Sequence, residues 1–259
     1  MKVVILCGGL GTRMREETEF RPKPMVEIGG RPILWHIMKL YAHHGFDDFV
    51  LCVGYKGQII KDYFLNYEAW NRDCTITLGD HKSVEFHGGH LETGWRVTVA
   101  DTGQDTMTGG RVKAVERYVD GDEFMVTYGD GLADVDLRAL LAFHREHGKV
   151  ATVTATRPLS RFGVVDLDDE SVVRRFREKP TSDDWVNSGF FIFNRTFFEY
   201  LDPDSVLERE PLEELAREEE IVAYRHDGFF RPMDTYRETL LLNELWAAGK
   251  APWAVWEDA

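Results

Sequence analysis

The first 25 residues of the chain combine the side chains and the backbone flexibility that suit phosphate binding. An apolar run, residues 2–7 (KVVILC), is followed at once by residues 8–13 (GGLGTR). Glycines after a buried strand let backbone N–H groups approach anionic oxygens closely. Thr12 adds a hydroxyl, Arg13 a guanidinium, and Lys23 an ammonium held between two prolines. These residues predict a cradle for the triphosphate of a nucleotide.

Two common nucleotide-binding motifs do not fit these glycines. A P-loop requires Gly-Lys followed by Ser or Thr, and residues 8–16 contain no lysine. The dinucleotide-binding fingerprint requires a third glycine three residues after the second, where this chain has Met14. The glycines alone would also fit a simple tight turn. Only together with Thr12, Arg13 and Lys23 do they point to a triphosphate.

The composition favours a folded acidic protein that does not bind nucleic acid. The chain has 259 residues, 43% of them hydrophobic, and a formal net charge of −14. A nucleic-acid binder normally presents a basic face, whereas a single nucleotide needs only a local basic cluster. The length suits one α/β domain, and we expect residues 1–259 to form a single domain.

The cysteines and the N-terminus predict a cytoplasmic protein. Cys7, Cys52 and Cys74 each lie in or beside an apolar run and form no C-x-x-C pair, so we expect small buried side chains in a reducing compartment. The N-terminus lacks the pattern of a signal peptide. No apolar stretch approaches the length of a membrane span.

Strand-like and helix-like segments alternate along the chain. The expected buried strands are residues 2–7, 49–53, 124–128 and 150–156, and the expected helices are residues 33–44, 58–66, 112–118, 137–147 and 236–248. This order predicts an α/β fold in which a mainly parallel mixed sheet is flanked by helices on both faces. Ligands of such sheets bind at the carboxyl ends of the strands, so the loop at Gly8 and the pair Gly129 and Asp130 should face one cleft.

Two segments interrupt this alternation. Residues 80–100 are rich in turns and contain three glycines, and we expect a hairpin insertion there. Residues 162–193 contain short strands and turns, and we expect a small β-rich subregion over the cleft.

Two aspartates are candidate metal ligands. Asp130 directly follows a buried strand, and Asp234 lies where a loop meets the last helix. Each could instead have a local role, because aspartates form turns and cap helices; Asp234 could cap the helix that starts near Tyr236. A triphosphate reaction, however, needs a hard cation, and Mg²⁺ takes one or two carboxylates together with phosphate oxygens.

In this combination the start of the chain resembles the sugar-nucleotidyltransferase family, which carries the same G-G-x-G-T-R and P-K-P elements. The resemblance extends over essentially the whole chain. It implies a Rossmann-like nucleotide-diphospho-sugar transferase fold with a β-rich sugar-binding subregion. It also implies that Asp130 and Asp234 hold Mg²⁺, and that Arg13, Lys23 and Asp130 are catalytic.

The resemblance also implies the substrate contacts. For the nucleotide they are Leu6, Cys7, Gly8, Gly9, Leu10, Gly11, Thr12, Arg13, Lys23, Thr106, Thr108, Arg111 and Gly129. For the sugar phosphate they are Gly163, Glu178, Lys179, Asn187 and Gly189, with Lys179 of the E-K-P element on the phosphate.

Within the family, residues 26–30, 33–38, 106–111 and 228–235 are most similar to the members that use CTP and glucose 1-phosphate. The implied products are CDP-glucose and pyrophosphate, and the implied assembly is a homo-oligomer, a hexamer. Two alternatives remain: the same fold with UTP, dTTP or GTP, and a non-catalytic sugar-nucleotide sensor. Retention of Lys23, Asp130 and Asp234 argues against the sensor, which could lose them and still bind.

Overall fold

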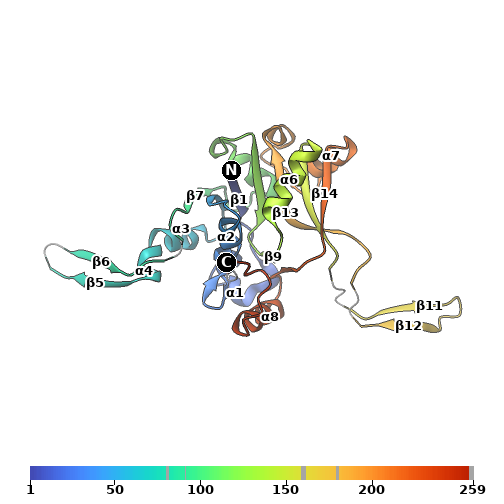
Figure 1. The fold of residues 1–259 in the computed structure, drawn as a ribbon, viewed down its shortest axis with the longest axis horizontal. Coiled ribbons are helices and arrows are strands. Elements are labelled where there is room, and N and C mark those ends of the chain that lie inside the picture. The colour runs from blue at the N-terminus through green and yellow to red at the C-terminus, as the bar shows by residue number, and fades with distance from the viewer. Residues whose placement is uncertain (80–81, 91, 159–161, 179–180, 257–259) are drawn as a thin grey trace.

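A seven-stranded mixed sheet forms the centre of the molecule (Figure 1). The computed structural model describes residues 1–79, 82–90, 92–158, 162–178 and 181–256. In spatial order the strands are β14 (Ile221–His226), β10 (Ala151–Thr156), β13 (Val186–Asn194), β8 (Glu123–Tyr128), β1 (Lys2–Leu6), β4 (Asp48–Val53) and β7 (Arg96–Asp101). Strand β13 is antiparallel to both of its neighbours and every other pairing is parallel, which confirms the mainly parallel mixed sheet.

Helices cover both faces of this sheet. The α-helices are α1 (Arg15–Thr18), α2 (Ile33–His43), α3 (Gly57–Leu65), α4 (Tyr67–Asn71), α5 (Thr108–Ala114), α6 (Leu137–His147), α7 (Glu210–Arg217) and α8 (Tyr236–Ala247). Short 3₁₀ helices occupy Thr12–Met14, Lys23–Met25, Glu116–Tyr118 and Arg195–Tyr200. Successive side chains of a strand point to opposite faces, so β1 buries Ile5 under α2 and Val4 under α5. A strand that is apolar on both sides therefore requires helices on both sides.

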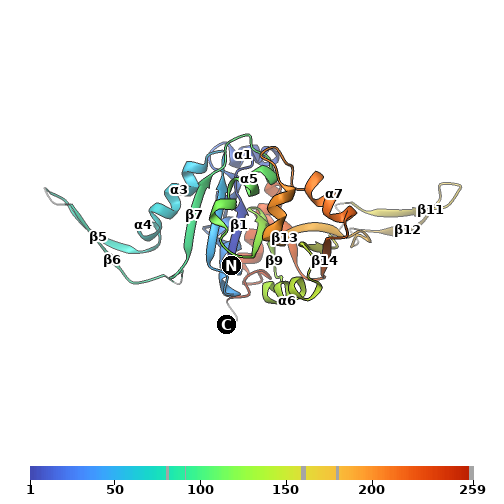
Figure 2. The same ribbon diagram turned by 90° about the horizontal axis from the view of Figure 1, so that it is seen from above.

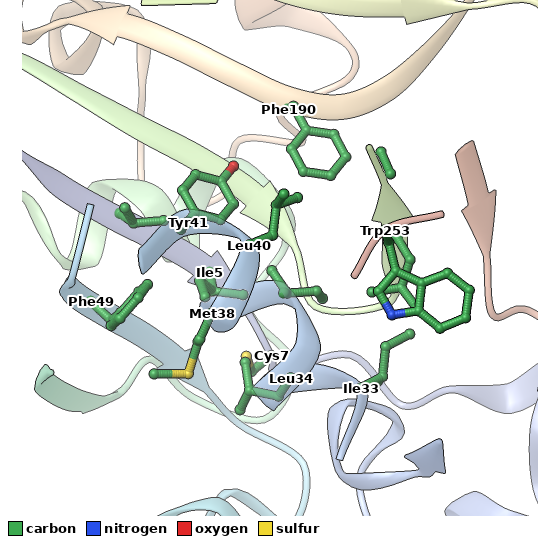
Figure 3. Close-up of a cluster of buried hydrophobic side chains, with 14 of the residues drawn as sticks. Ile5, Cys7, Ile33, Leu34, Met38, Leu40, Tyr41, Phe49, Phe190 and Trp253 are labelled. Carbon is green, nitrogen blue, oxygen red and sulfur yellow. The ribbon is translucent and has the colours of Figure 1, made fainter. Parts of the chain in front are cut away.

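The larger of the two cores lies between the sheet and helices α2, α6 and α8 (Figure 3). Ile5, Tyr41 and Phe190 are each no more than 1% exposed there, and Trp253 from the segment after α8 is fully buried in the same cluster. Burial of one such side chain stabilises the fold by about 1.5–3 kcal/mol. This packing fixes the strands whose ends form the site.

Two hairpins project from opposite ends of the molecule (Figures 1 and 2). One consists of β5 (Asp73–Thr77) and β6 (Ser83–His87), and the other of β11 (Val164–Leu167) and β12 (Val173–Arg177). The remaining short pairs are β2 (Glu27–Ile28) with β3 (Arg31–Pro32), and β9 (Gly131–Ala133) with β15 (Phe230–Pro232). Cys74 lies on the first hairpin and is exposed, so the expectation that all three cysteines are buried is wrong.

Both predicted insertions had wrong boundaries. The first hairpin begins at Asp73, before the predicted segment, and residues 96–101 form β7 at the edge of the main sheet. The second segment does contain the hairpin β11–β12, but its last part belongs to β13 inside the main sheet. Residues 96–101 lie at the edge of the sheet and are mostly half-buried or exposed, so their sequence resembles that of a projecting hairpin. Strand β13 starts with two exposed residues, so its beginning resembles the end of a separate β-rich subregion.

Candidate active site

A cleft of about 1980 Å³ opens at the carboxyl ends of β1 and β8. Its walls include residues 6–12, Lys23, Gly129, Asp130 and Asp234. The prediction that the loop at Gly8 and the pair Gly129 and Asp130 share one cleft is therefore confirmed. Parallel strands cause this, because β1 and β8 pair in register and end side by side.

The loop after β1 offers backbone donors to this cleft. Among the described residues, no acceptor is hydrogen-bonded to the backbone N–H groups of residues 8–12. Carbonyls at both ends of this stretch have partners: that of Leu6 accepts from the Gly129 N–H at 3.0 Å, that of Gly8 from Arg111 at 3.1 Å, and that of Gly11 from the Met14 N–H at 3.0 Å. Backbone donors rarely remain unpaired, so this loop is arranged for water or for an anionic ligand. The side chain of Arg13 lies outside the part of the chain that the structure describes.

Arg111 fixes the position of this loop. It is 4% exposed, and its two amino groups donate to the carbonyls of Gly8, Val53, Gly103 and Gln104 and to the hydroxyl of Thr102. A Cβ atom at Gly8 would lie 2.1 Å from the guanidinium, so glycine is required there. Arg111 lines the cleft as predicted, and the structure adds that it ties three loops together.

Lys23 joins the two aspartates predicted to bind metal. Its ammonium lies 2.5 Å from Oδ2 of Asp130 and 2.7 Å from Oδ1 of Asp234. Burial alone would lower the pKa of Lys23, but the charges and hydrogen bonds of both carboxylates outweigh burial and raise it. Lys23 is therefore charged at neutral pH, and the two carboxylates face one cationic position.

Local structure brings these three residues together from distant parts of the chain. Lys23 opens a 3₁₀ helix after Pro22, Asp130 follows β8, and Asp234 follows β15. Strand β15 pairs with β9 directly after Asp130, and the Met233 N–H donates to the Asp130 carbonyl at 2.8 Å. The helix α8 is capped by Thr235 and Glu238 in a capping box, so the alternative role of Asp234 as the helix cap is wrong.

The donor set suits a hard divalent cation. Two carboxylate oxygens already contact one ammonium within 2.7 Å, and Mg²⁺ completes such a pair with water and phosphate oxygens. No group of three potential metal-ligating side chains occurs among the described residues, so protein ligands alone do not complete a shell there. This pattern is typical of a metal that is shared with a phosphate substrate.

The other wall of the cleft carries part of the predicted sugar site. Asn187 lines the cleft, and its Oδ1 accepts from the Gly189 N–H at 2.8 Å. Gly189 has φ +87°, and a Cβ atom there would lie 2.2 Å from the Tyr128 ring. Gly163 and Glu178 lie together at the base of the hairpin β11–β12, where their neighbours rather than they line the cleft. Lys179 lies outside the described residues.

Four residues of the predicted turn at residues 106–111 line the same cleft: Thr106, Met107, Thr108 and Arg111. Thr106 is half-buried there. The Thr108 hydroxyl donates to Glu208 at 2.6 Å and accepts from the Leu207 N–H at 2.9 Å. Tyr128, which also lines the cleft, donates to the same Glu208 at 2.5 Å. Sequence reasoning did not single out Tyr128 or Glu208; the only signal was an aromatic residue next to the Gly-Asp pair.

Comparison with known proteins identifies the family. Residues 2–250 match the family model described as nucleotidyl transferase. The chain belongs to this family.

Two curated relatives match this nucleotidyl transferase over its whole length. Glucose-1-phosphate cytidylyltransferase of Salmonella typhi is 52% identical over 99% of this chain and 100% of the relative. A probable glucose-1-phosphate cytidylyltransferase of Bacillus subtilis is 44% identical, with the same two coverages. Among solved structures, HddC from Yersinia pseudotuberculosis superposes with a TM-score of 0.68 at 22% identity, over 95% of this chain and 99% of that one. The last likeness concerns the fold alone.

Members of this nucleotidyl transferase family generally use a divalent metal, which agrees with the carboxylate pair of Asp130 and Asp234. Among the described residues, no helix is both long and apolar enough to cross a membrane.

Proposed function

We propose that this nucleotidyl transferase transfers a cytidylyl group from CTP to α-D-glucose 1-phosphate, giving CDP-glucose and pyrophosphate. The observation that carries the proposal is the full-length identity of 52% to a glucose-1-phosphate cytidylyltransferase. The cleft supports it, because the N–H groups of residues 8–12 have no acceptor among the described residues, Lys23 supplies a cation and Asn187 supplies an amide suited to sugar hydroxyls.

The nucleotide is assigned to the wall formed by β1, the loop after it and the turn at residues 106–111. The N–H groups of residues 8–12 and the ammonium of Lys23 would bind the triphosphate, with Arg13 beside them. Leu6, Cys7, Thr106, Thr108, Arg111 and Gly129 would surround the base and ribose. The support is that all of these positions except Arg13, whose side chain lies outside the described part, line the cleft.

Asp130 and Asp234 are the residues that would hold the metal, which we propose to be Mg²⁺. A bound Mg²⁺ ion supplies positive charge to the oxygens of the triphosphate. The two hard oxygen donors, each within 2.7 Å of one cationic position, support this choice.

The sugar phosphate is assigned to the opposite wall. Lys179 would bind its phosphate, while Asn187 and Gly189 would bind hydroxyls of the sugar near Gly163 and Glu178. An asparagine amide both donates and accepts, which suits hydroxyl groups. The support is that Asn187 lines the same cleft as the residues assigned to the nucleotide.

The reaction in this cleft is a direct displacement. A phosphate oxygen of glucose 1-phosphate attacks the α-phosphorus of CTP in line, and pyrophosphate leaves with the electron pair of the broken bond. Binding along two facing walls aligns attacking and leaving oxygens, and Lys23 stabilises the charge that develops on the phosphates. No covalent intermediate with the protein is required.

The deciding experiment measures pyrophosphate release with glucose 1-phosphate and each of CTP, UTP, dTTP and GTP. Cytosine has a hydrogen-bond donor and an acceptor at two positions where uracil has an acceptor and a donor. Buried protein groups that pair with cytosine therefore remain unpaired when uracil binds. We expect kcat/KM for CTP to exceed that for UTP by at least about tenfold, equivalent to roughly 1.4 kcal/mol. Equal values would remove the cytidylyl assignment and keep the nucleotidyl transferase, whereas release with none of the four would favour a sensor.

We further propose that residues 1–259 form one domain and that the protein is a cytoplasmic homo-oligomer, a hexamer. The seven-stranded sheet supports one domain, because it joins strands from residue 2 to residue 226. Three free cysteines agree with a reducing compartment. Isolated two-stranded hairpins are marginally stable in water, so the projecting pairs β5–β6 and β11–β12 favour burial against other copies. Light scattering of the purified protein measures the assembly directly.

A further inference from the structure

A chain of four polar side chains connects the two walls of the cleft. Thr108 at the start of α5 donates to Oε2 of Glu208 at 2.6 Å, and Tyr128 at the end of β8 donates to Oε1 of Glu208 at 2.5 Å. Asn187 on β13 donates to the Tyr128 hydroxyl at 3.5 Å. Thr108, Tyr128 and Asn187 line the cleft, whereas the exposed residue Glu208 does not line it and joins Thr108 to Tyr128.

The segment that carries Glu208 is held against the nucleotide wall. Its Leu207 N–H donates to the Thr108 hydroxyl at 2.9 Å, and its Ser205 carbonyl accepts from the Gly110 N–H at 3.0 Å. A Cβ atom at Gly110 would lie 2.0 Å from the carbonyl oxygen of Pro203, so the segment packs directly on α5. The carboxylate of Glu208 is therefore placed by the helix that also carries Arg111 and positions the Gly8 loop.

The carboxylate also sets the hydrogen-bond direction on the sugar wall. A tyrosine hydroxyl has one proton, which Tyr128 donates in its hydrogen bond to Glu208, so the lone pairs of the Tyr128 oxygen remain as acceptors. Asn187 then points its amino group toward Tyr128 and its carbonyl oxygen toward the Gly189 N–H. These two hydrogen bonds define the orientation of the Asn187 amide.

We propose that Glu208 is a positioning residue that orients Tyr128 and Asn187 for the sugar phosphate and links their orientation to the nucleotide wall through Thr108. This inference rests on the proposed function and deepens it. Removal of the carboxylate frees the Tyr128 hydroxyl to rotate and the Asn187 amide to flip. The sugar-phosphate site then loses preorganisation, whereas the groups that would carry the chemistry are untouched.

The test compares Glu208→Ala and Glu208→Gln with the matched control Asp204→Asn. Asp204 is an exposed carboxylate in the same segment and has no hydrogen bond or ion pair among the described residues. Glutamine keeps the shape of Glu208, but its NH₂ group cannot accept a hydrogen bond from Thr108 or Tyr128. We expect both Glu208 variants to raise KM for glucose 1-phosphate about tenfold with kcat changed less than about threefold, and the control to match wild type.

A double-mutant cycle with Tyr128→Phe separates positioning from a general structural role. If Glu208 acts through Tyr128, the effects of Glu208→Ala and Tyr128→Phe on KM are not additive. A normal KM in both Glu208 variants, a loss confined to kcat, or full additivity with Tyr128→Phe would each overturn the proposal. Wild-type pyrophosphate release from CTP and glucose 1-phosphate is measured first, so a failure of the proposed function is seen separately from a failure of this inference.

Discussion

Replacement of Lys23 by methionine tests whether a metal and the ammonium compete for the same position. The ammonium contacts Asp130 at 2.5 Å and Asp234 at 2.7 Å, and the three side chains are 12%, 29% and 19% exposed. Loss of the cation leaves two carboxylates facing each other. Breaking a fully buried ion pair costs about 3–5 kcal/mol, and the partial exposure here reduces the expected cost to about 2 kcal/mol. In a chain of this size that corresponds to a fall of roughly 4–8 °C in Tm.

Added Mg²⁺ should restore much of this loss in Lys23→Met and stabilise the wild type less, because the wild-type ammonium already occupies the position between the carboxylates. The measurement is Tm by calorimetry without nucleotide, over a series of Mg²⁺ concentrations. Lys39→Met is the matched control, because Lys39 pairs with Glu92 at 2.9 Å with exposures of 12% and 6%, and neither residue lines the cleft. It should lose stability without recovering in Mg²⁺.

An equal response to Mg²⁺ in wild type, Lys23→Met and Lys39→Met would refute the reasoning. The double variant Lys23→Met with Asp130→Asn gives a second check. It removes one of the two facing charges, so it should be more stable than Lys23→Met without metal and should not respond to Mg²⁺.

Two further predictions concern the metal ligands and acid stability. Asp130→Asn and Asp234→Asn should each lower turnover with CTP and glucose 1-phosphate by at least about a hundredfold at saturating Mg²⁺, because an amide is a weaker ligand for a hard cation. The circular dichroism spectrum should not change. Near-normal turnover in either variant would remove that residue from the metal site. His36 is fully buried, and burial lowers its pKa to about 4 from 6.5. The unfolded chain then binds a proton more readily than the folded one, so the stability that neutral His36 contributes is complete above pH 6.5 and is lost as the pH falls toward 4. Urea unfolding should show a loss of about 2 kcal/mol between pH 7 and pH 5 that disappears in His36→Gln, and an unchanged slope in that variant would contradict this assignment.

The parts of the site that depend on local pattern were predictable from sequence. Glycines after an apolar strand predicted a loop at the strand end, and the rule for parallel strands correctly predicted that this loop and Asp130 line one cleft. Asp234 could be recognised only by resemblance. It comes close to Lys23 because β15 pairs with β9, and no pattern in the neighbouring sequence predicts that pairing. The contact spans 211 residues of sequence.

The failures have a common physical cause. Strand β13 was not predicted as part of the main sheet because its first two residues are exposed and Gly189, a poor strand former, follows them. Glu208 was missed because an exposed glutamate in an acidic segment is ordinarily solvated, and only the folded positions of Thr108 and Tyr128 give it partners. In each case tertiary contact, rather than propensity, determines the role of the residue.

The burial of Trp253 has a consequence for how the chain folds during synthesis. This side chain is fully buried with Ile33 and Leu34, and its indole N–H donates to Nδ1 of His36 at 3.3 Å, across 217 residues of sequence. The first strand leaves the ribosome early, yet the core beside it cannot close until residue 253 has emerged. Contacts between such distant residues slow folding, so the nascent chain exposes an unfinished apolar surface for almost the whole of its translation. Chaperones would therefore have their longest opportunity to act at the surface of α2 that Trp253 finally covers.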